Sequence, residues 1–172
     1  MIARNRIWIE LKQAKSNIIC LQRYTDRGRK RLRIFDSAII LLSTAGALGS
    51  GVSGIIWIAV IASGLIALGS ILKSILPNIT QSEQELSELD RLMDFYSKYM
   101  NNLEKLWYEY DKKNIDERTM IMQLFEMKKD EADKYSALNK GIRSISKKKQ
   151  AEIDKESENY INEVYFKIEE NE

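Results

Sequence analysis

The pattern of apolar and polar positions divides this chain into one long apolar run and the helical segments on either side of it. Between Asp36 and Lys73 there are 36 consecutive residues without a formal charge, and six glycines lie among them. As a single α-helix this run would be about 54 Å long, whereas the hydrocarbon core of a bilayer is only about 30 Å thick. The pattern therefore predicts two antiparallel membrane helices.

The two arms of the predicted hairpin differ in length. The second arm, about residues 55–76, has the length and composition of a standard transmembrane helix. The first arm, about residues 34–48, is several residues shorter, so it must thin the bilayer, sit re-entrant or begin in the basic segment before it. A turn of glycine, serine and valine over residues 49–54 joins them. We expect a transmembrane hairpin over residues 34–76.

Two segments outside the hairpin carry apolar residues with a period of 3.5, which is typical of helices that pack side by side. The N-terminal seam consists of Ile7, Leu11, Ala14, Ile18 and Leu21. The bundle seam of the tail consists of Leu86, Leu89, Met93, Tyr96, Met100, Leu103, Trp107 and Tyr110. Because the hairpin returns the chain to its starting side, we expect these two seams to pack together, within one chain or between chains.

Residues that stop or cap helices mark where the tail begins. Pro77 follows the second arm and would stop or bend a helix. The spacing of Thr80 to Glu83 and of Ser82 to Glu85 matches a capping box, in which a hydroxyl and a carboxylate satisfy free backbone N–H groups. A new helix is therefore expected to begin at this point.

The rest of the tail predicts further helices. Asn114 and Asp116 mark a break, after which a second helix is expected to fold back, with apolar positions Ile121, Leu124, Met127, Tyr135, Leu138, Ile142 and Ile145. A third stretch is either a final helix or a continuation of the second, and its apolar positions are Ile153, Tyr160, Val164 and Ile168. No strand pattern is present. We predict an all-α membrane protein: a basic N-terminal helix (1–33), the hairpin (34–76) and a helical bundle or coiled-coil stalk (81–172).

The charges are distributed unevenly along the chain. Residues 1–36 carry ten basic and three acidic residues, whereas residues 81–172 carry 16 basic and 22 acidic residues. A basic belt immediately before the hairpin consists of Arg23, Arg27, Arg29, Lys30, Arg31 and Arg33. Since Lys and Arg concentrate on the cytoplasmic side of membrane helices, we expect both termini in the cytoplasm and the belt at the membrane surface. The single cysteine, Cys20, would then lie in a reducing compartment.

The residue types argue against catalysis. The chain contains no histidine and one cysteine, so the commonest general base and a cysteine zinc cluster are absent. The glycines of the hairpin do not form a phosphate-binding loop, because neither a Gly-Lys-Ser/Thr ending nor a strand-turn-helix context accompanies them. We therefore expect no catalytic residues, no metal and no cofactor.

Small residues at i, i+4 spacing give each arm a face on which helices can approach closely in lipid. These faces consist of Ser43, Ala47 and Gly51 on the first arm and Ala59, Ser63 and Ala67 on the second. They favour packing inside one hairpin, and the alternative is contact between subunits around a pore, to which Ser70 could contribute.

Two further features could bind nucleic acid or another anion, but each has a simpler interpretation. A second basic cluster comprises Lys140, Arg143, Lys147, Lys148 and Lys149. It is interpreted as a solvated face, with an anionic ligand or the membrane surface as the alternative. The aromatic residues Trp107 and Tyr110 lie on the bundle seam, so they favour core packing over base stacking. Nucleic acid is not expected as a partner.

The order of these features resembles the SLATT-type proteins, a family of bacterial two-transmembrane effectors. The matching parts are the basic approach from Arg23-Tyr24 to Arg33, the hairpin from Ile34 to Leu76 and the helical tail from Gln81. The resemblance implies a pore-forming effector of anti-phage defence, triggered through a partner such as a nucleotide synthase or sensor protein. No separate nucleotide-sensor domain is recognisable here, which favours activation by a partner or by oligomerisation.

These observations together predict a non-enzymatic effector that forms homo-oligomers in the bacterial inner membrane and makes the bilayer permeable. A membrane-anchored scaffold or adaptor, which recruits a partner through its helical tail, is the first alternative. A phage holin is the second, although the cytoplasmic region is large for one. The sequence leaves open whether the hairpin is an anchor or the working part of the protein.

Overall fold

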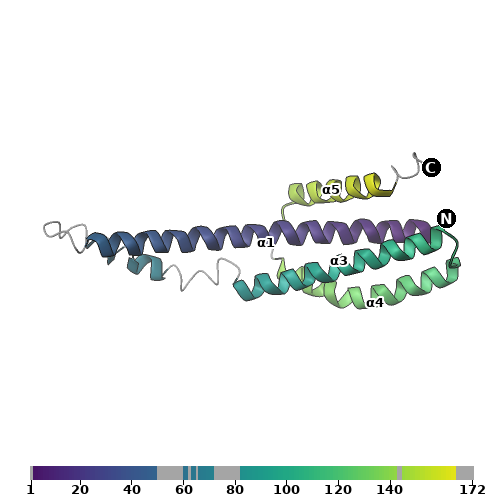
Figure 1. Ribbon diagram of the computed structural model, residues 1–172, viewed down its shortest axis with the longest axis horizontal. Helices are drawn as coiled ribbons and strands as arrows, with labels where there is room; N and C mark the ends of the chain where they lie inside the picture. Colours follow the sequence, from purple (N-terminus) through teal and green to yellow (C-terminus); the bar gives the residue numbers. More distant parts are fainter. Residues whose placement is uncertain are drawn as a thin grey trace. The chain divides into compact units, whose positions relative to one another are not determined.

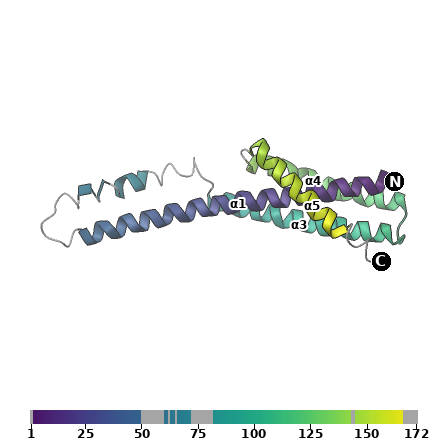
Figure 2. The ribbon, with the colours of Figure 1, turned by 90° about the horizontal axis from the view of Figure 1, so that it is seen from above.

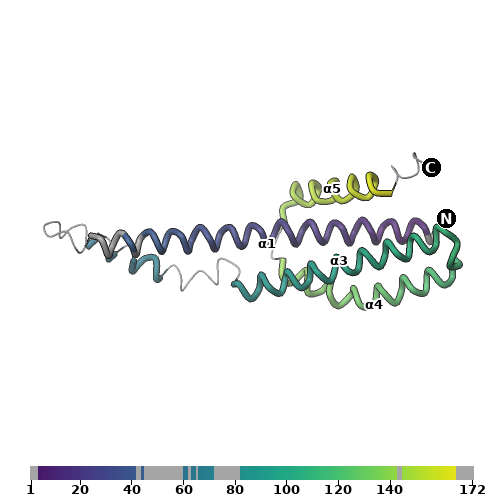
Figure 3. Tube along the Cα trace, viewed as in Figure 1, coloured from purple at the N-terminus to yellow at the C-terminus, as the bar shows by residue number. Residues whose placement is uncertain are grey.

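The computed structural model describes residues 2–49, 60–61, 63–64, 66–71, 82–142 and 145–165 (Figure 1). Figure 3 draws the same chain as a tube along its Cα trace. The named helices are α1 (Ile2–Gly49), α3 (Glu83–Asp111), α4 (Glu117–Gly141) and α5 (Lys147–Tyr165). Within these ranges the regular structure is entirely helical, so the predicted all-α class is confirmed for the described residues. No helix among them is both long and apolar enough to cross a bilayer.

The chain divides into two compact units. One, the helical bundle, comprises Met1–Tyr24 and Ser87–Glu172, and the other, the hairpin unit, comprises Thr25–Leu86. Helix α1 runs unbroken from one unit into the other, so Gly28 does not interrupt it. The sequence had placed the boundary between N-terminal helix and hairpin at residues 33 and 34.

Only part of the predicted hairpin lies in the described residues. The first arm, 34–48, is the end of α1. The second arm, 55–76, is described at 60–61, 63–64 and 66–71, where it is helical. Of the predicted turn, 49–54, only Gly49 is described, and Thr80 also falls outside the described part.

The two heptad seams share one hydrophobic core within a single chain. From α1 this core takes Ile7, Leu11, Ala14 and Leu21, and from α3 it takes Leu89, Leu92, Tyr96, Tyr99, Met100, Leu103 and Leu106. Tyr96 is completely buried, and burying such an aromatic side chain contributes strongly to a core. In the helical bundle, Figure 1 shows α3 and α4 on one side of α1 and α5 on the other.

Helix ends follow local capping chemistry. The Ser82 N–H donates to Glu85 Oε2 at 2.9 Å, and the Glu85 N–H donates to Ser82 Oγ at 3.1 Å, which confirms the predicted capping box. At the break after α3, Asp116 caps α4 by accepting a hydrogen bond from the Thr119 N–H at 2.9 Å. Hydrogen bonds from Thr119, first from its side chain and then from its backbone N–H, lower the pKa of the Asp116 carboxyl. Lys113 takes a φ of 60°, a backbone conformation that turns the chain sharply.

Helix α5 is separate from α4 and packs on α1, so the last apolar stretch is not a continuation of the preceding helix. From above, α5 lies over α1 and crosses it obliquely (Figure 2). Ser16 Oγ donates to Asp154 Oδ1 at 3.0 Å, and Lys12 forms an ion pair with Glu158 at 3.0 Å. These contacts set the register of α5 along α1.

Candidate functional site

The hairpin unit exposes large apolar side chains from both of its arms. Large apolar side chains of α1 are exposed at Ile34, Ile40 and Leu41, the last to 71%. The second arm adds exposed side chains at Val60, Ile61, Ile66, Leu68 and Ile71. We call these eight residues the apolar surface. Several large apolar side chains exposed in one unit favour a membrane or protein interaction site, because water solvates them poorly.

Hydroxyl groups in this unit form hydrogen bonds within their own helices. Thr44 Oγ1 donates to the Ile40 carbonyl at 2.8 Å, and Ser70 Oγ donates to the Ile66 carbonyl at 3.0 Å. A hydroxyl bonded to the carbonyl four residues earlier needs no water partner. Such side chains are compatible with an apolar surrounding, where an unsatisfied hydroxyl would be costly.

The predicted packing residues of the second arm face outward where they are described. Ser63, Ala67 and Ser70 are exposed, so their side chains are accessible in a single chain. Gly69, by contrast, is buried, and a Cβ added there would lie 4.0 Å from Ile39 Cγ1, an ordinary van der Waals distance. The side chains of Ser43 and Ala47, and Gly51 and Ala59 as a whole, lie outside the described residues.

The basic belt is divided between the two units. Arg27, Arg29, Lys30, Arg31 and Arg33 belong to the hairpin unit and are exposed. Their positive charge is thus presented at the surface just before the apolar residues.

The remaining belt residue, Arg23, belongs to the helical bundle. It is half-buried and forms ion pairs with Glu156 and, at 3.9 Å, with Glu152 on α5. Arg23 therefore links α1 to α5, a contact that the sequence did not indicate.

The bundle seam lies in the interior of the tail. Leu86, Leu89, Tyr96, Met100 and Leu103 are buried. The other three seam residues, Met93, Trp107 and Tyr110, pack against the core while partly buried. Trp107 also lies near Trp8 and Tyr165, with ring centroids at 5.9 and 6.0 Å. The aromatic residues of the seam thus contribute to packing.

Two buried tyrosines of the bundle form hydrogen bonds with carboxylates. Tyr99 OH donates to Glu10 at 3.4 Å, and Lys128 also bonds to Glu10. Burial raises the pKa of Tyr99, and the negative charge of Glu10 adds to this shift. Tyr96 is similar, since burial and its hydrogen-bond partner Glu131 raise the pKa of its phenol. Both phenols therefore stay protonated and act as donors rather than as bases.

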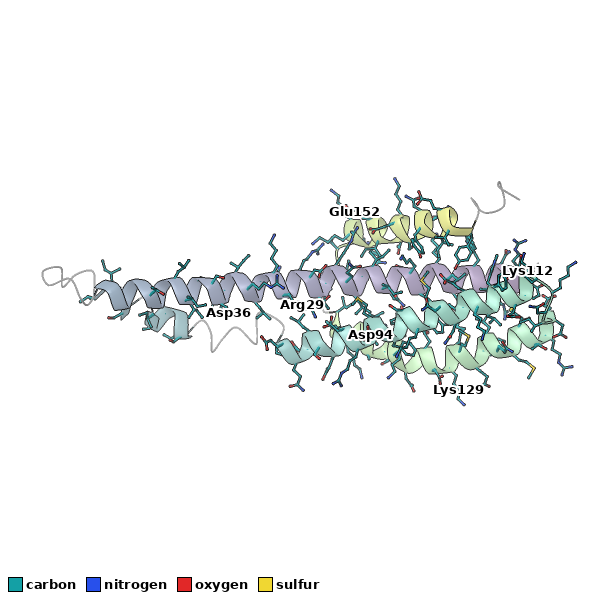
Figure 4. All side chains as sticks on the ribbon, in the orientation of Figure 1. Arg29, Asp36, Asp94, Lys112, Lys129 and Glu152 are labelled. Carbon is teal, nitrogen blue, oxygen red and sulfur yellow. The ribbon has the colours of Figure 1, made fainter. Side chains whose placement is uncertain are left out.

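The charged groups are otherwise spread over the surface of the bundle. Asp94, Lys112, Lys129 and Glu152 are exposed and project from their helices (Figure 4). In the described part of the chain no three acidic or cysteine side chains lie close enough together to hold a metal ion.

Two hollows in the bundle were not predicted from the sequence. A groove of about 760 Å³ lies between α3 and α4, with Met122 and Phe125 exposed along it. A smaller cavity of about 280 Å³ has Asn17 of α1 in its wall. The only sequence signal for either hollow is Asn17, a polar residue next to the N-terminal seam. Polar residues at such positions are usually exposed, so the sequence did not indicate that Asn17 is buried beside a cavity.

Comparison with known proteins gives no family assignment. No family model matches the chain, and no curated protein or solved structure is significantly similar to it.

Proposed function

We propose that this protein is a non-enzymatic membrane effector whose hairpin unit inserts into a bilayer and whose helical bundle stays in the aqueous phase. The observation that carries this proposal is the apolar surface, of which seven of the eight residues lie within the uncharged run of 36 residues. Each large apolar side chain withdrawn from water contributes about 1.5–3 kcal/mol, so eight of them favour insertion strongly. The hydroxyls of Thr44 and Ser70, which donate hydrogen bonds to carbonyls of their own helices, are compatible with a place inside the bilayer.

The orientation follows from the charges. The exposed basic residues 27–33 lie on α1 immediately before the apolar surface, where they would contact anionic headgroups on the cytoplasmic side. The bundle carries ionic side chains over its surface, as Figure 4 illustrates for Lys129 and Glu152, and it suits the aqueous side. We therefore place both termini in the cytoplasm and the hairpin unit in the inner membrane.

The effector would act as a homo-oligomer. Ser63 and Ala67 are small, exposed and four residues apart, so a second copy could approach this face closely in lipid. Assembly of several hairpins would enclose a path for ions and dissipate the membrane potential. The resemblance to SLATT-type effectors supports a role in anti-phage defence, with a nucleotide synthase or sensor protein as the trigger.

Insertion and permeabilisation are tested separately. After expression in bacteria, a membrane-inserted chain stays in the membrane pellet during extraction at alkaline pH, whereas release into the supernatant contradicts insertion. Purified protein reconstituted in anionic vesicles should then release a trapped dye. An inserted protein that leaves both the dye and the membrane potential unchanged under activating conditions would exclude the pore.

A matched pair of variants tests the role of the small-residue face. Ala67→Phe puts a bulky ring on the proposed contact between subunits and should reduce dye release at least tenfold. Leu68→Phe is the control, because Leu68 is exposed in the same segment and already large, so its ring would face lipid. Equal release by the two variants would contradict assembly through this face.

A scaffold or adaptor is the second candidate, and the groove between α3 and α4 favours it. Met122 and Phe125 are exposed to 60% and 56% along this groove, and such residues suit a helix of a partner protein. Replacing residues 34–76 with an unrelated two-span anchor separates the candidates. An adaptor keeps its biological activity after this replacement, whereas a pore-forming effector loses it.

A further inference from the structure

Helix α5 is a peripheral element of the helical bundle. It lies on the side of α1 opposite α3 and α4 (Figure 1), and within Lys147–Tyr165 only Ile153, Ser157 and Ile161 are buried. Ile153 belongs to a small cluster with Ile19 and Cys20 that is separate from the main core. Two isoleucines are thus the buried apolar side chains of α5.

The face of α1 beneath α5 is basic. Lys12, Lys15 and Arg23 lie on it, and each contacts a side chain of α5. Residues 11–25 of the chain include no acidic residue, so this part of α1 supplies no carboxylate of its own to these cations. In α5, by contrast, residues 150–165 include five acidic residues and one basic residue. The two helices are therefore complementary in charge.

The ion pairs define a register between the helices. Lys12 pairs with Glu158 at 3.0 Å, and Arg23 pairs with Glu156 and, at 3.9 Å, with Glu152. The partners follow in reverse order along the chain, so α5 runs antiparallel to α1. An acidic helix in this register matches the basic face over about three turns of α1.

Lys15 adds a contact that requires an aromatic ring. Its Nζ lies 3.4 Å from the centroid of the Tyr160 ring, within the range of a cation–π interaction. Burial lowers the pKa of Lys15, and the negative charges of Glu104 on α3 and Glu156 on α5 oppose this shift. A helix that docks on this face therefore gains from a ring as well as from carboxylates.

The ion pairs that hold α5 are individually weak. The side chains of Lys12 and Arg23 are 36% exposed, and those of their partners are between 51% and 55% exposed. Ion pairs at such positions contribute little stability and are screened by salt, because water competes for both charges. The docking of α5 is therefore open to competition from a helix that forms the same contacts.

We propose that the face of α1 around Lys12, Lys15 and Arg23 is a docking face for an acidic amphipathic helix of a partner protein, and that α5 occupies it in the partner's absence. A helix fits better than a lipid surface, because the hydrogen bond of Ser16 to Asp154 and the contact of Lys15 with a ring are directional. Binding of the partner would release α5. The docking does not depend on the membrane role, whereas its use by the trigger protein rests on the proposed function.

A synthetic acidic helix tests this face. The peptide has alanine or glutamine except at the positions that correspond to Glu152, Ile153, Asp154, Glu156, Glu158, Tyr160 and Ile161. Fluorescence anisotropy with the full-length chain in mild detergent should show saturable binding, which weakens severalfold at high salt. A scrambled peptide of the same composition should bind at least tenfold more weakly. Equal binding of the two peptides would show attraction by net charge alone, as a membrane or a nucleic acid would give, and would overturn the proposal.

Two variants of the chain separate the docking face from the helix that occupies it. Glu156→Gln, on α5, should make the peptide bind severalfold tighter, because α5 competes less and the face is unchanged. Arg23→Glu reverses a charge of the face, so a peptide with arginine at the position of Glu156 should bind this variant at least tenfold tighter than it binds wild type. Lys98→Glu, at an exposed position on α3, is the control for net charge and should bind both peptides as wild type does.

Hydrogen exchange measures the release of α5. When the peptide binds, the backbone amides of residues 147–165 should exchange severalfold faster, while those of α3 stay protected. The proposal is overturned if the peptide binds saturably neither to wild type nor to Glu156→Gln, or if it binds without faster exchange in α5. Neither measurement depends on membrane insertion or dye release, so the docking face and the proposed function can fail separately.

A second copy of the chain is the other occupant to test. Chains with Ser16→Cys are mixed with chains with Asp154→Cys, all with Cys20→Ala, because these two positions are in contact when α5 lies on α1. We expect no disulfide that joins the two kinds of chain. Its formation in most chains would assign the face to α5 of another copy and overturn the proposal of a separate partner.

Discussion

Lys128 on α4 donates a hydrogen bond to the carboxylate of Glu10 on α1. The Glu10 side chain is 15% exposed and the Lys128 side chain 43%, so the pair is buried on one side only. Tyr99 on α3 donates to the other carboxylate oxygen at 3.4 Å. One carboxylate therefore connects three helices of the bundle.

Loss of the Lys128 ammonium should destabilise the bundle. Lys128→Met leaves Glu10 with Tyr99 as its remaining partner in this group and is expected to lower the free energy of unfolding by about 1–2 kcal/mol, between the values for exposed and buried pairs. The measurement is urea unfolding of the full-length chain in mild detergent. Lys12→Met breaks the more exposed pair with Glu158 and serves as the control, with an expected loss below about 1 kcal/mol. Equal losses in the free energy of unfolding would show that the burial of Glu10 does not strengthen its ion pair with Lys128.

The ion pairs of Arg23 should control the docking of α5. Arg23→Gln removes its contacts with Glu152 and Glu156, so α5 should open more often. Hydrogen exchange of the backbone amides in residues 147–165 should become severalfold faster, while exchange in α3 stays the same. High salt should accelerate exchange in the wild type as well, because it screens exposed ion pairs. Uniform acceleration over the whole bundle would contradict a local role.

Cys20 should make stability depend on pH in the alkaline range. Its folded pKa is about 11, above the ordinary thiol value of 9.0, so the folded state retains a proton that the unfolded state releases. The stabilisation is complete below about pH 9 and is lost as the pH rises through about 11, a change on the order of 1–3 kcal/mol.

Comparison with a variant isolates the thiol. Cys20→Ala lacks this titration, so the difference in Tm between wild type and variant should shrink or change sign between pH 9 and pH 11. Buried tyrosines such as Tyr99 titrate in both proteins and cancel in the difference. A difference in Tm that is constant with pH would show that the thiol is not held neutral by burial.

Glycine at position 141, the last residue of α4, lies close against a core side chain. A Cβ added there would lie 2.8 Å from Leu89 Cδ2, and Leu89 is itself a buried residue of the core. Gly141→Ala is therefore expected to destabilise the bundle by about 1 kcal/mol or more, since the gain in helix propensity is smaller than the cost of overpacking. Thermal unfolding measures the change.

A double variant tests the cause of this loss. Leu89→Ala opens the space that the new methyl group needs, so Gly141→Ala should cost less in that background than in wild type. If the stability losses of the two single variants simply add, the loss in Gly141→Ala does not come from the contact with Leu89.

The sequence predicted the elements of the bundle well, because their signals are local. The seam positions Leu11, Leu89 and Leu103 recur with the helical period, and the Ser82 capping box depends on residues three apart. The break at Asp116 was similarly evident. Met120, which is completely buried on α4, was missed because the expected apolar face began one residue later, at Ile121.

The polar contacts were not predictable in the same way. Arg23 was expected at the membrane surface, yet its partners Glu152 and Glu156 lie more than 120 residues away in the chain. The unused donor of Asn17 likewise exists only because α4 and α5 come to lie over it. Long-range pairing of charges leaves no periodic signal in a single sequence.

The sequence by itself determined that the chain is helical, that two of its seams match, and that one uncharged run separates them, because periodicity and composition report directly on helices and on apolar segments. Only the tertiary structure decided that the seams pair within one chain, that α5 docks on α1 with Arg23 paired to its carboxylates, and that Asn17 is buried in the wall of a cavity. These depend on which side chains meet in space, and burial then sets their hydrogen bonds and the pKa of Cys20.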